Sequence, residues 1–406
     1  MAEQLRIFLG AFGEPGHAFP MLALGARLAE RGHEVTLETW SRWRAHVEAE
    51  GMRFVPAPEY PVFPTQERPL KPYEAVVRAC AETLEVMRDC SPDVVVHDVL
   101  TLAPALSAEL LGAPAATLIP HLYPVGGPGI PPYALGARLP RTFIGRRLWG
   151  TTERVVNKGL RQGRAELNET RRKLGLAPTE RLHGGISAEL CIVGTFPSLE
   201  YPRPWPSSVH MVGPLMWEPP YHDVELPDGE DPLVLVAPST AQDPEHRMLR
   251  CALAGLADAP VRVLAATNRK AVRRPVSVPA NARLVEWLSY SRTMPHCSVV
   301  ITHAGHGTLA RALSCGCPVV AVPHAGDMGE NAARADWAGV GVRLPWRFLS
   351  PGTLRLAVER ALANPSLGAH AQAIADWAQR NDSAARGAEL VEDLALSRRG
   401  AIAEMR

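Results

Sequence analysis

A strand, a glycine-rich turn and a helix follow one another in residues 299–313, which read VVITHAGHGTLARAL. The run Val299–Thr302 is rich in β-branched residues, which is typical of a parallel strand buried on both faces. We expect the helix to open at Thr308, where free backbone N–H groups and the positive end of the helix dipole favour an anion. The stretch therefore predicts an α/β fold with a phosphate-binding turn at the carboxyl edge of its sheet.

Short apolar runs alternate with helical stretches along the rest of the chain as well. In the first half we expect strands at Leu5–Gly10, Glu34–Glu38, Asp93–His97, Ala115–Ile119 and Leu190–Val193. In the second half we expect them at Leu233–Ala237, Val261–Ala265, Ala282–Val285, Val299–Thr302, Val319–Val322 and Val340–Leu344. Two such series predict two doubly wound, Rossmann-like α/β domains.

A cluster of prolines separates the two series. Seven of the chain's 38 prolines lie from Pro197 to Pro220, and such a density fits neither a helix nor a sheet interior. We therefore predict an N-terminal domain over residues 1–197, a linker over 198–220 and a C-terminal domain over 221–380. Residues 381–406 are predicted to form a C-terminal helix that packs back toward the N-terminal domain, followed by a tail.

The composition limits the class of protein. A chain of 406 residues with 46% hydrophobic and 21% charged residues is an ordinary globular protein of about two domains. Its formal charge of +1 shows no global bias toward nucleic acid or an anionic membrane. No signal peptide and no apolar run long enough for a membrane span is visible, which predicts a cytoplasmic location without stable membrane insertion. The scattered cysteines predict reduced thiols and no metal site.

A first candidate site lies after the first strand. His17 follows Gly16 at the turn into the next helix, and Asp98 lies at the end of the third strand, at the same sheet edge. A carboxylate beside an imidazole would orient it as a general base. A turn histidine bonded to the backbone and a strand-end cap are the structural alternatives for these two residues.

A second candidate site surrounds the turn already quoted. Glycines needed for a tight turn explain Gly305 and Gly307 but not the histidines beside them. The residues predicted to bind the second ligand are Thr240, Trp287, His303, Gly305, Gly307, Thr308 and Asp327. Thr240 and His303 would reach phosphates, Trp287 a nucleobase and Asp327 sugar hydroxyls, although a tryptophan at a strand end also serves packing alone. No Asp-x-Asp pair occurs for a metal-bridged diphosphate, so the helix start must neutralise most of its charge.

A proline-rich segment, Pro120–Phe143, is predicted to be a long surface loop that starts at the His17 edge. Its rings at Tyr123, Tyr133 and Phe143 are predicted to hold a small hydrophobic ligand. A second loop, Pro56–Pro72, is expected to form the facing wall. A loop that packs its rings on its own domain is the alternative.

The chain resembles the GT-B glycosyltransferases of family 1, in particular the bacterial antibiotic and macrolide type. The opening motif runs from Gly16-His17 to Val35, a second motif runs from Pro92 to Pro114, and a donor-binding signature runs from Trp287 to Ala333. The resemblance implies two domains that face each other across a cleft. It also implies inverting, metal-independent transfer of a sugar from UDP or dTDP to a hydroxyl of a small lipophilic natural product, without a cofactor, by a monomer or homodimer.

The resemblance implies a role for each candidate residue. His17 would deprotonate the acceptor and Asp98 would hold His17. Trp287 would stack on the base, Asp327 would contact the sugar, and the remaining donor residues would bind the diphosphate. Three departures stand out: Arg311 replaces a ribose-binding glutamate, Met328 replaces a glutamine, and Ser289-Tyr290 replaces a Pro-Gln pair. A sugar-nucleotide 2-epimerase and an auxiliary protein without donor binding are the rival interpretations.

Overall fold

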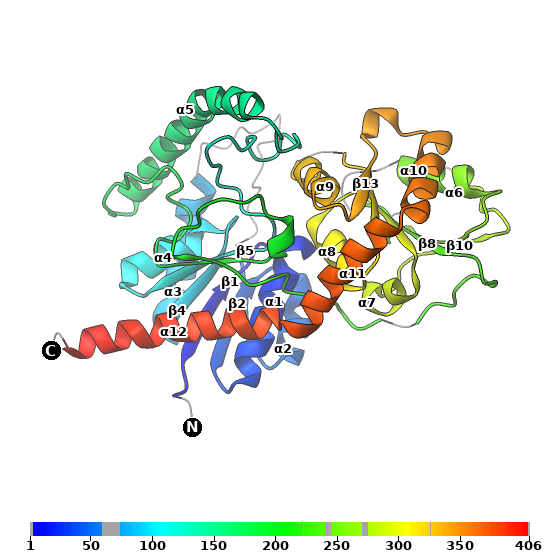
Figure 1. Cartoon of the computed structure of the whole chain (residues 1–406). Helices are drawn as coiled ribbons and strands as arrows, with labels where there is room; N and C mark the ends of the chain where they lie inside the picture. Colours follow the sequence, from blue (N-terminus) through cyan, green and yellow to red (C-terminus); the bar gives the residue numbers. More distant parts are fainter. Residues whose placement is uncertain are drawn as a thin grey trace.

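The computed structural model describes residues 3–58, 74–221, 223–239, 243, 245–269, 275–324 and 326–404. These residues form two parallel sheets, each flanked by helices (Figure 1). The first sheet has the strand order β3-β2-β1-β4-β5-β6-β7 and the second the order β10-β9-β8-β11-β12-β13. Every pairing within both sheets is parallel. The prediction of two Rossmann-like α/β domains is confirmed.

The N-terminal domain is built on the first sheet. Its strands are β1 (Arg6–Gly10), β2 (Glu34–Thr39), β3 (Arg53–Pro56), β4 (Val94–Asp98), β5 (Ala115–Ile119), β6 (Leu190–Val193) and β7 (Val209–Met211). Its helices are α1 (Pro15–Glu30), α2 (Arg44–Ala49), α3 (Glu74–Cys90), α4 (Leu102–Leu111) and α5 (Phe143–Lys173). The central strands β1 and β4 pair in the register Phe8↔Val95 and bury their side chains on both faces. This burial explains why they read as continuous apolar runs.

The C-terminal domain is built on the second sheet. Its strands are β8 (Leu233–Ala237), β9 (Arg262–Ala266), β10 (Ala282–Val285), β11 (Val299–Thr302), β12 (Val319–Ala321) and β13 (Gly341–Arg343). Its helices are α6 (Arg247–Leu256), α7 (Tyr290–Thr293), α8 (His306–Ser314), α9 (Met328–Trp337), α10 (Pro351–Ala363) and α11 (Pro365–Arg380). In each sheet the strand order reverses between two central strands, β1 and β4 or β8 and β11. Ligands of open α/β sheets bind at this switch point.

The last helix, α12 (Ser383–Glu404), follows α11 and runs back along the N-terminal domain (Figure 1). Its apolar residues Ala388 and Val391 belong to the N-terminal core. Glu392 of α12 accepts hydrogen bonds from Arg31 at 2.6 and 2.7 Å. The helix therefore ties the end of the chain to the first domain.

A buried ion cluster joins the two domains. Arg334 of α9 contacts Glu330 at 2.9 Å and Glu200, which follows β6, at 3.0 Å. Its guanidinium also lies 3.4 Å from the ring centroid of Tyr201. Glu200 in turn accepts a hydrogen bond from the backbone N–H of Tyr123 at 2.6 Å. Because breaking such a buried pair leaves an uncompensated charge, this cluster fixes how the domains meet.

Two boundaries differ from the sequence prediction. Strand β7 lies inside the segment 198–220 that we predicted to be a linker, and it extends the first sheet beside β6. The three residues of β7 contain no proline, so the proline count of the wider segment hid them. Helix α8 begins at His306 with Gly305 as its N-cap, two residues before the predicted start at Thr308.

Candidate active site

The side chains of His17 and Asp98 meet at the switch point of the first sheet. His17 lies in the first turn of α1, and its Nδ1 is 2.7 Å from Oδ2 of Asp98 at the end of β4. The other oxygen, Oδ1 of Asp98, accepts a hydrogen bond from the N–H of Leu100 at 2.7 Å. The Asp98 side chain is 1% exposed, whereas that of His17 is 17% exposed. Asp98 is therefore a fixed anchor, and Nε2 of His17 carries the available lone pair.

The pKa of His17 reflects both burial and charge. Burial lowers this pKa, but the charge and hydrogen bond of Asp98, together with the charges of Asp327 and Glu14, raise it above its ordinary value of 6.5. Asp327 belongs to the C-terminal domain, where it precedes α9. The charge of a residue in the C-terminal domain thus contributes to the raised pKa of His17.

Aromatic rings surround His17 on the N-terminal side. The rings of Phe12 and His121 lie edge-on to it, with centroids at 5.9 and 6.0 Å. The ring of Tyr133 stacks on His121, and its hydroxyl lies 3.2 Å from Nδ1 of His121. Gly13 makes room for Trp40, whose ring meets Phe12 edge-on at 5.0 Å, because a Cβ at Gly13 would lie 2.0 Å from the Trp40 ring. The wall beside the imidazole is thus largely aromatic, which suits an apolar ring system.

The start of α8 faces the same region from the C-terminal domain. The first intrahelical hydrogen bond runs from Leu309 N to Gly305 O at 3.0 Å, so the N–H groups of His306, Gly307 and Thr308 precede it. Gly307 is exposed and Thr308 half-buried. This geometry is the anion site that helix starts provide.

The reason for glycine in this turn differs from our expectation. The left-handed residue is Ala304, with φ of 65°, whereas Gly305 has φ of −61°. A Cβ at Gly305 would lie 2.3 Å from Nε2 of His303. Gly305 is therefore required by the close approach of the His303 ring, whose Nδ1 lies 3.5 Å from the carbonyl of Ala237.

His306 holds the domains together as a neutral side chain. Its Nε2 donates to the carbonyl oxygen of Gly194, which follows β6 of the first sheet, at 3.1 Å. Burial lowers the pKa of His306 to about 4, and the positive potential of His121 makes a smaller contribution in the same direction. Because this imidazole is neutral, the charge of an anion at α8 is balanced mainly by the N–H groups and the dipole at the helix start.

Asp327 is held at the N-cap of α9. Its Oδ2 accepts a hydrogen bond from Nδ2 of Asn331 at 3.1 Å, and the same amide bonds the carbonyl of Ala304 at 2.9 Å. Asn331 thus couples the loop before α9 to the left-handed turn before α8. Asp327 remains half-exposed at the site.

Trp287 lies after β10 and is half-buried. The guanidinium of Arg269 covers its ring at 4.8 Å from the centroid, and Tyr221 meets it edge-on at 6.3 Å. Trp287 therefore lies in a cluster with the ring of Tyr221 and the cation of Arg269. Thr240, the remaining predicted donor residue, lies outside the described residues, as does most of the loop Pro56–Pro72.

The structure brings only one of the three predicted acceptor residues to His17, namely Tyr133. Tyr123 is 6% exposed and packs in a separate core cluster against Trp205, so it does not belong to the group of rings beside His17. Phe143 is the first residue of α5, and its side chain is 76% exposed. Tyr123 is buried by Trp205, which follows β6 and lies far from the loop in sequence. The loop's own sequence therefore does not predict this burial.

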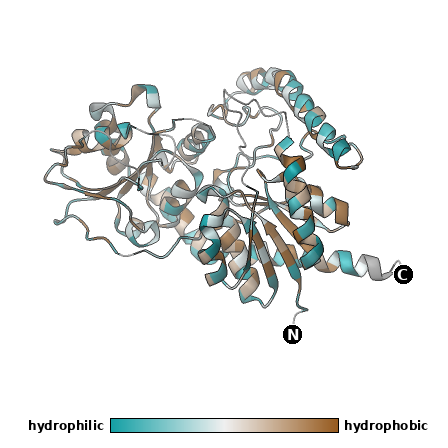
Figure 2. Ribbon diagram, turned by 180° about the vertical axis from the view of Figure 1, so that it is seen from behind, coloured by the Kyte–Doolittle hydropathy of each residue, from teal (hydrophilic) through white to brown (hydrophobic). Residues whose placement is uncertain are grey.

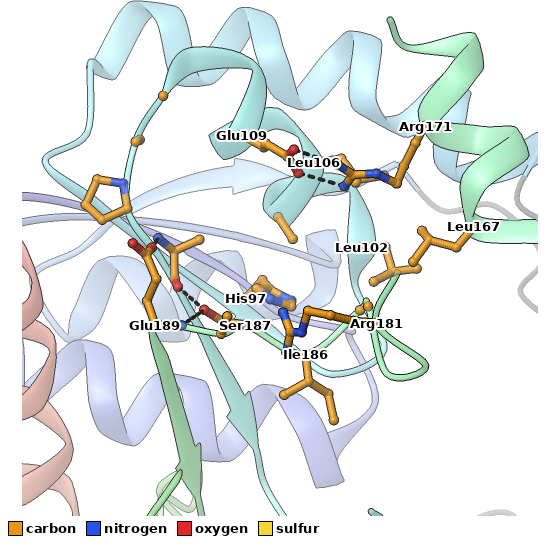
Figure 3. A pocket seen from close by; sticks show the side chains of 18 of the residues that line it. His97, Leu102, Leu106, Glu109, Leu167, Arg171, Arg181, Ile186, Ser187 and Glu189 are labelled. Carbon is orange, nitrogen blue, oxygen red and sulfur yellow. Dashed lines mark hydrogen bonds and ion pairs between the residues drawn. The ribbon is translucent and has the colours of Figure 1, made fainter. Parts of the chain in front are cut away.

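A separate pocket of about 440 Å³ lies beyond α4, between that helix and residues 181–189 (Figure 3). His97 lies at its base, and a bidentate pair between Arg171 and Glu109, at 2.7 and 2.6 Å, borders it. Neighbouring side chains of a strand point to opposite faces, so His97 faces away from the side that Asp98 presents to His17. Nδ1 of His97 donates to two carbonyls and its Nε2 accepts from Thr117 at 2.7 Å, which makes it a structural residue.

His121 is one of the rings of the predicted loop Pro120–Phe143, but sequence reasoning gave it no separate role in the site. It lies two residues after the predicted strand Ala115–Ile119, at the same sheet edge as His17 and Asp98. That position was the available signal. Among the described residues no group of His, Cys, Asp or Glu side chains is arranged to hold a metal ion. No helix in the described part of the chain is both long and apolar enough to span a membrane.

Two family models match the chain, one in each domain. Residues 7–115 match the N-terminal domain of glycosyltransferase family 28. Residues 250–395 match the C-terminal domain of the family described as erythromycin biosynthesis protein CIII-like. The first match includes His17 and Asp98, and the second includes the start of α8 and Asp327.

Known proteins show the same similarity over nearly the full length. The 4'-demethylrebeccamycin synthase of Lentzea aerocolonigenes is 28% identical over 427 residues, which covers 96% of this chain and 99% of the synthase. The solved structure of the calicheamicin glycosyltransferase CalG4 superposes with a TM-score of 0.72 at 24% identity, over 97% of this chain and 98% of CalG4. Glycosyltransferase VinC, solved in complex with DTDP, superposes with a TM-score of 0.69 at 20% identity, over 97% and 100%.

Two parallel-sheet domains with one shared site define the GT-B fold, as the sequence predicted. Together with the two family matches, this architecture makes the protein an enzyme of the glycosyltransferase class. In sequence and in fold the chain is similar to GT-B glycosyltransferases of the antibiotic type.

Proposed function

We propose that this glycosyltransferase moves a sugar from a UDP or dTDP donor to a hydroxyl of a small, lipophilic, ring-bearing natural product. The observation that carries the proposal is the 2.7 Å pair of His17 and Asp98 opposite the start of α8. Natural-product acceptors are supported by the erythromycin-type family match and by the synthase relative. A diphosphate donor is supported by the DTDP bound to VinC and by the free N–H groups of α8.

The proposed reaction is a single displacement. Nε2 of His17 takes the proton of the acceptor hydroxyl, while Asp98 stabilises the imidazolium that forms. The acceptor oxygen bonds to the anomeric carbon, and the bond from this carbon to the diphosphate oxygen breaks on the opposite side. The nucleoside diphosphate leaves with the electron pair and is stabilised by the start of α8. One displacement inverts the anomeric configuration.

The direct test is to incubate the protein with UDP-glucose or dTDP-glucose and a panel of phenolic and polyketide-like acceptors. We expect a glycoside by mass spectrometry, with the inverted anomer by proton NMR and unchanged rates in EDTA. A retained anomer would exclude the single displacement, and loss of rate in EDTA would exclude metal independence. Epimerised donor without adduct would identify a 2-epimerase, and no reaction with any donor would favour an auxiliary protein.

We propose that the rings beside His17, including Tyr133, contact the acceptor. Comparing alanine variants of two tyrosines tests this. Tyr133→Ala should raise the acceptor KM with little change in the donor KM, because Tyr133 stacks beside His17 on His121. Tyr123→Ala should instead lower the free energy of unfolding by about 3–5 kcal/mol, because Tyr123 is a buried core residue. The opposite pattern, an acceptor effect only for Tyr123→Ala, would move the acceptor away from His17.

A further inference from the structure

The exposed face of α5 carries apolar and basic side chains in two adjoining rows. The apolar row contains Ile144, Leu148 and Val155, whose side chains are 71%, 63% and 75% exposed. Their spacing of four and seven residues places them along one side of the helix. An aliphatic row this exposed on a folded domain is unusual, because such side chains are normally buried against the core.

The basic row lies directly beside the apolar one. Arg147, Arg154, Lys158 and Arg161 are all exposed, and their spacing of seven, four and three residues keeps them on one side. None of these four forms an ion pair with another residue that the structure describes. From Phe143 to Arg161 the helix holds five basic residues and one acidic residue, although the whole chain has a formal charge of only +1. The positive charge is therefore concentrated on this face.

Among the described residues, none buries this face of α5. The helix lies at the outer edge of the N-terminal domain, away from its sheet (Figure 1). Apolar and polar residues alternate along it (Figure 2). Its packed residues, Leu167, Thr170 and Arg171, all lie near its C-terminal end. The half that carries the two rows, residues 143–161, forms a ridge that contains no buried residue.

We propose that this ridge docks the protein reversibly on an anionic lipid surface. A helix with aliphatic side chains beside unpaired Lys and Arg lies in the plane of a membrane, with the apolar side chains among the lipids and the cations on the headgroups. Charge complementarity selects the anionic surface, because a second copy paired on this face about a two-fold axis would place like charges opposite each other. Nucleic acid would leave the aliphatic row unused.

Docking would also orient the site. The loop that ends at α5 begins next to His121 and carries Tyr133, so its ligand wall and the docking ridge belong to one continuous segment. If the proposed lipophilic acceptor partitions into a membrane, it then reaches His17 from the docked side. Docking itself does not depend on the proposed function.

The experiment is flotation of the full chain with vesicles of phosphatidylcholine alone or with about one third phosphatidylglycerol. We expect binding only to the anionic vesicles, and weaker binding as salt rises. The triple variant R147Q, R154Q and K158Q should lower the partition coefficient about a hundredfold, since each cation near the surface contributes about a fivefold effect. The matched control R88Q, R360Q and R380Q removes the same charge from exposed arginines elsewhere and should bind like the wild type.

A double variant separates insertion of apolar side chains into the lipid from electrostatic attraction to the headgroups. Leu148→Gln with Val155→Gln should weaken binding even at low salt, whereas an electrostatic contact alone would leave low-salt binding unchanged and overturn the docked orientation. Equal binding to both vesicle types, or equal loss in the control variant, would overturn the proposal. So would a dimer in sedimentation that only Leu148→Gln with Val155→Gln dissociates, because the face would then hold a second copy. Transfer to a water-soluble acceptor should be unchanged in this variant, so a failure of docking is distinct from a failure of the proposed reaction.

Discussion

The two halves of the active site use different physical means. The N-terminal half depends on one ion pair, in which a buried Asp98 fixes a mostly buried His17, and on rings around it. The C-terminal half depends on backbone N–H groups at the start of α8, with His306 kept neutral by burial. A proton-transfer group needs a tuned pKa, whereas a diphosphate needs fixed dipoles that no proton can neutralise. The comparison predicts that the two halves fail in different ways when they are mutated.

The largest effect should come from His17→Ala, which removes the base. Transfer should fall about 10²–10⁴-fold, while the dissociation constant of UDP or dTDP in calorimetry stays close to that of the wild type. His210→Ala, in β7 on the N-terminal sheet, is the control and should leave both unchanged. Full turnover of His17→Ala on a weakly acidic alcohol would disprove the assignment.

The matching change in the other half is Trp287→Ala. Base stacking contributes about 1–3 kcal/mol, so nucleotide affinity should fall roughly five- to 150-fold while the acceptor KM hardly changes. Thr308→Ala should weaken the nucleotide in the same direction. Trp205→Ala, which removes the partner of Tyr123 in the N-terminal core, controls for loss of an indole. If calorimetry finds wild-type affinity for both Trp287→Ala and Thr308→Ala, the donor is bound elsewhere.

The smallest expected effect involves residues of both halves and appears in the pH profile of kcat/KM. His17 must be neutral to act as a base, so kcat/KM should be high above its raised pKa and fall as pH drops through it, at a pH above 6.5. Asp98→Asn removes the charge that raises this pKa and leaves burial, which lowers it, so the acid limb should move to lower pH. Asp327→Asn should move it in the same direction by less, because Asp327 has the smaller influence. An acid limb that Asp327→Asn does not move would show that the domains do not share one site in solution.

Sequence reasoning reached the site because of where strands end. His17, Asp98 and the α8 turn all follow central strands, and the carboxyl ends of parallel strands meet at one edge. It failed for residues whose role depends on tertiary packing. Tyr123 and Tyr133 look alike within one loop, but only contact with Trp205 or with His121 separates a core residue from a site residue. The short strand β7 carries too weak a local signal to be separated from the prolines around it.

By itself the sequence determined two parallel sheets, because continuous apolar runs separated by helices have no other stable arrangement than strands buried on both faces. It also determined which turns carry the chemistry, since local order places a residue at the end of a given strand. Only the tertiary structure decided that Asp327 of one domain acts on His17 of the other, and that His306 is neutral and bonded to Gly194. It also decided that α5 leaves an apolar and basic face exposed. These properties depend on what lies across an interface or in solvent, and no local pattern encodes that.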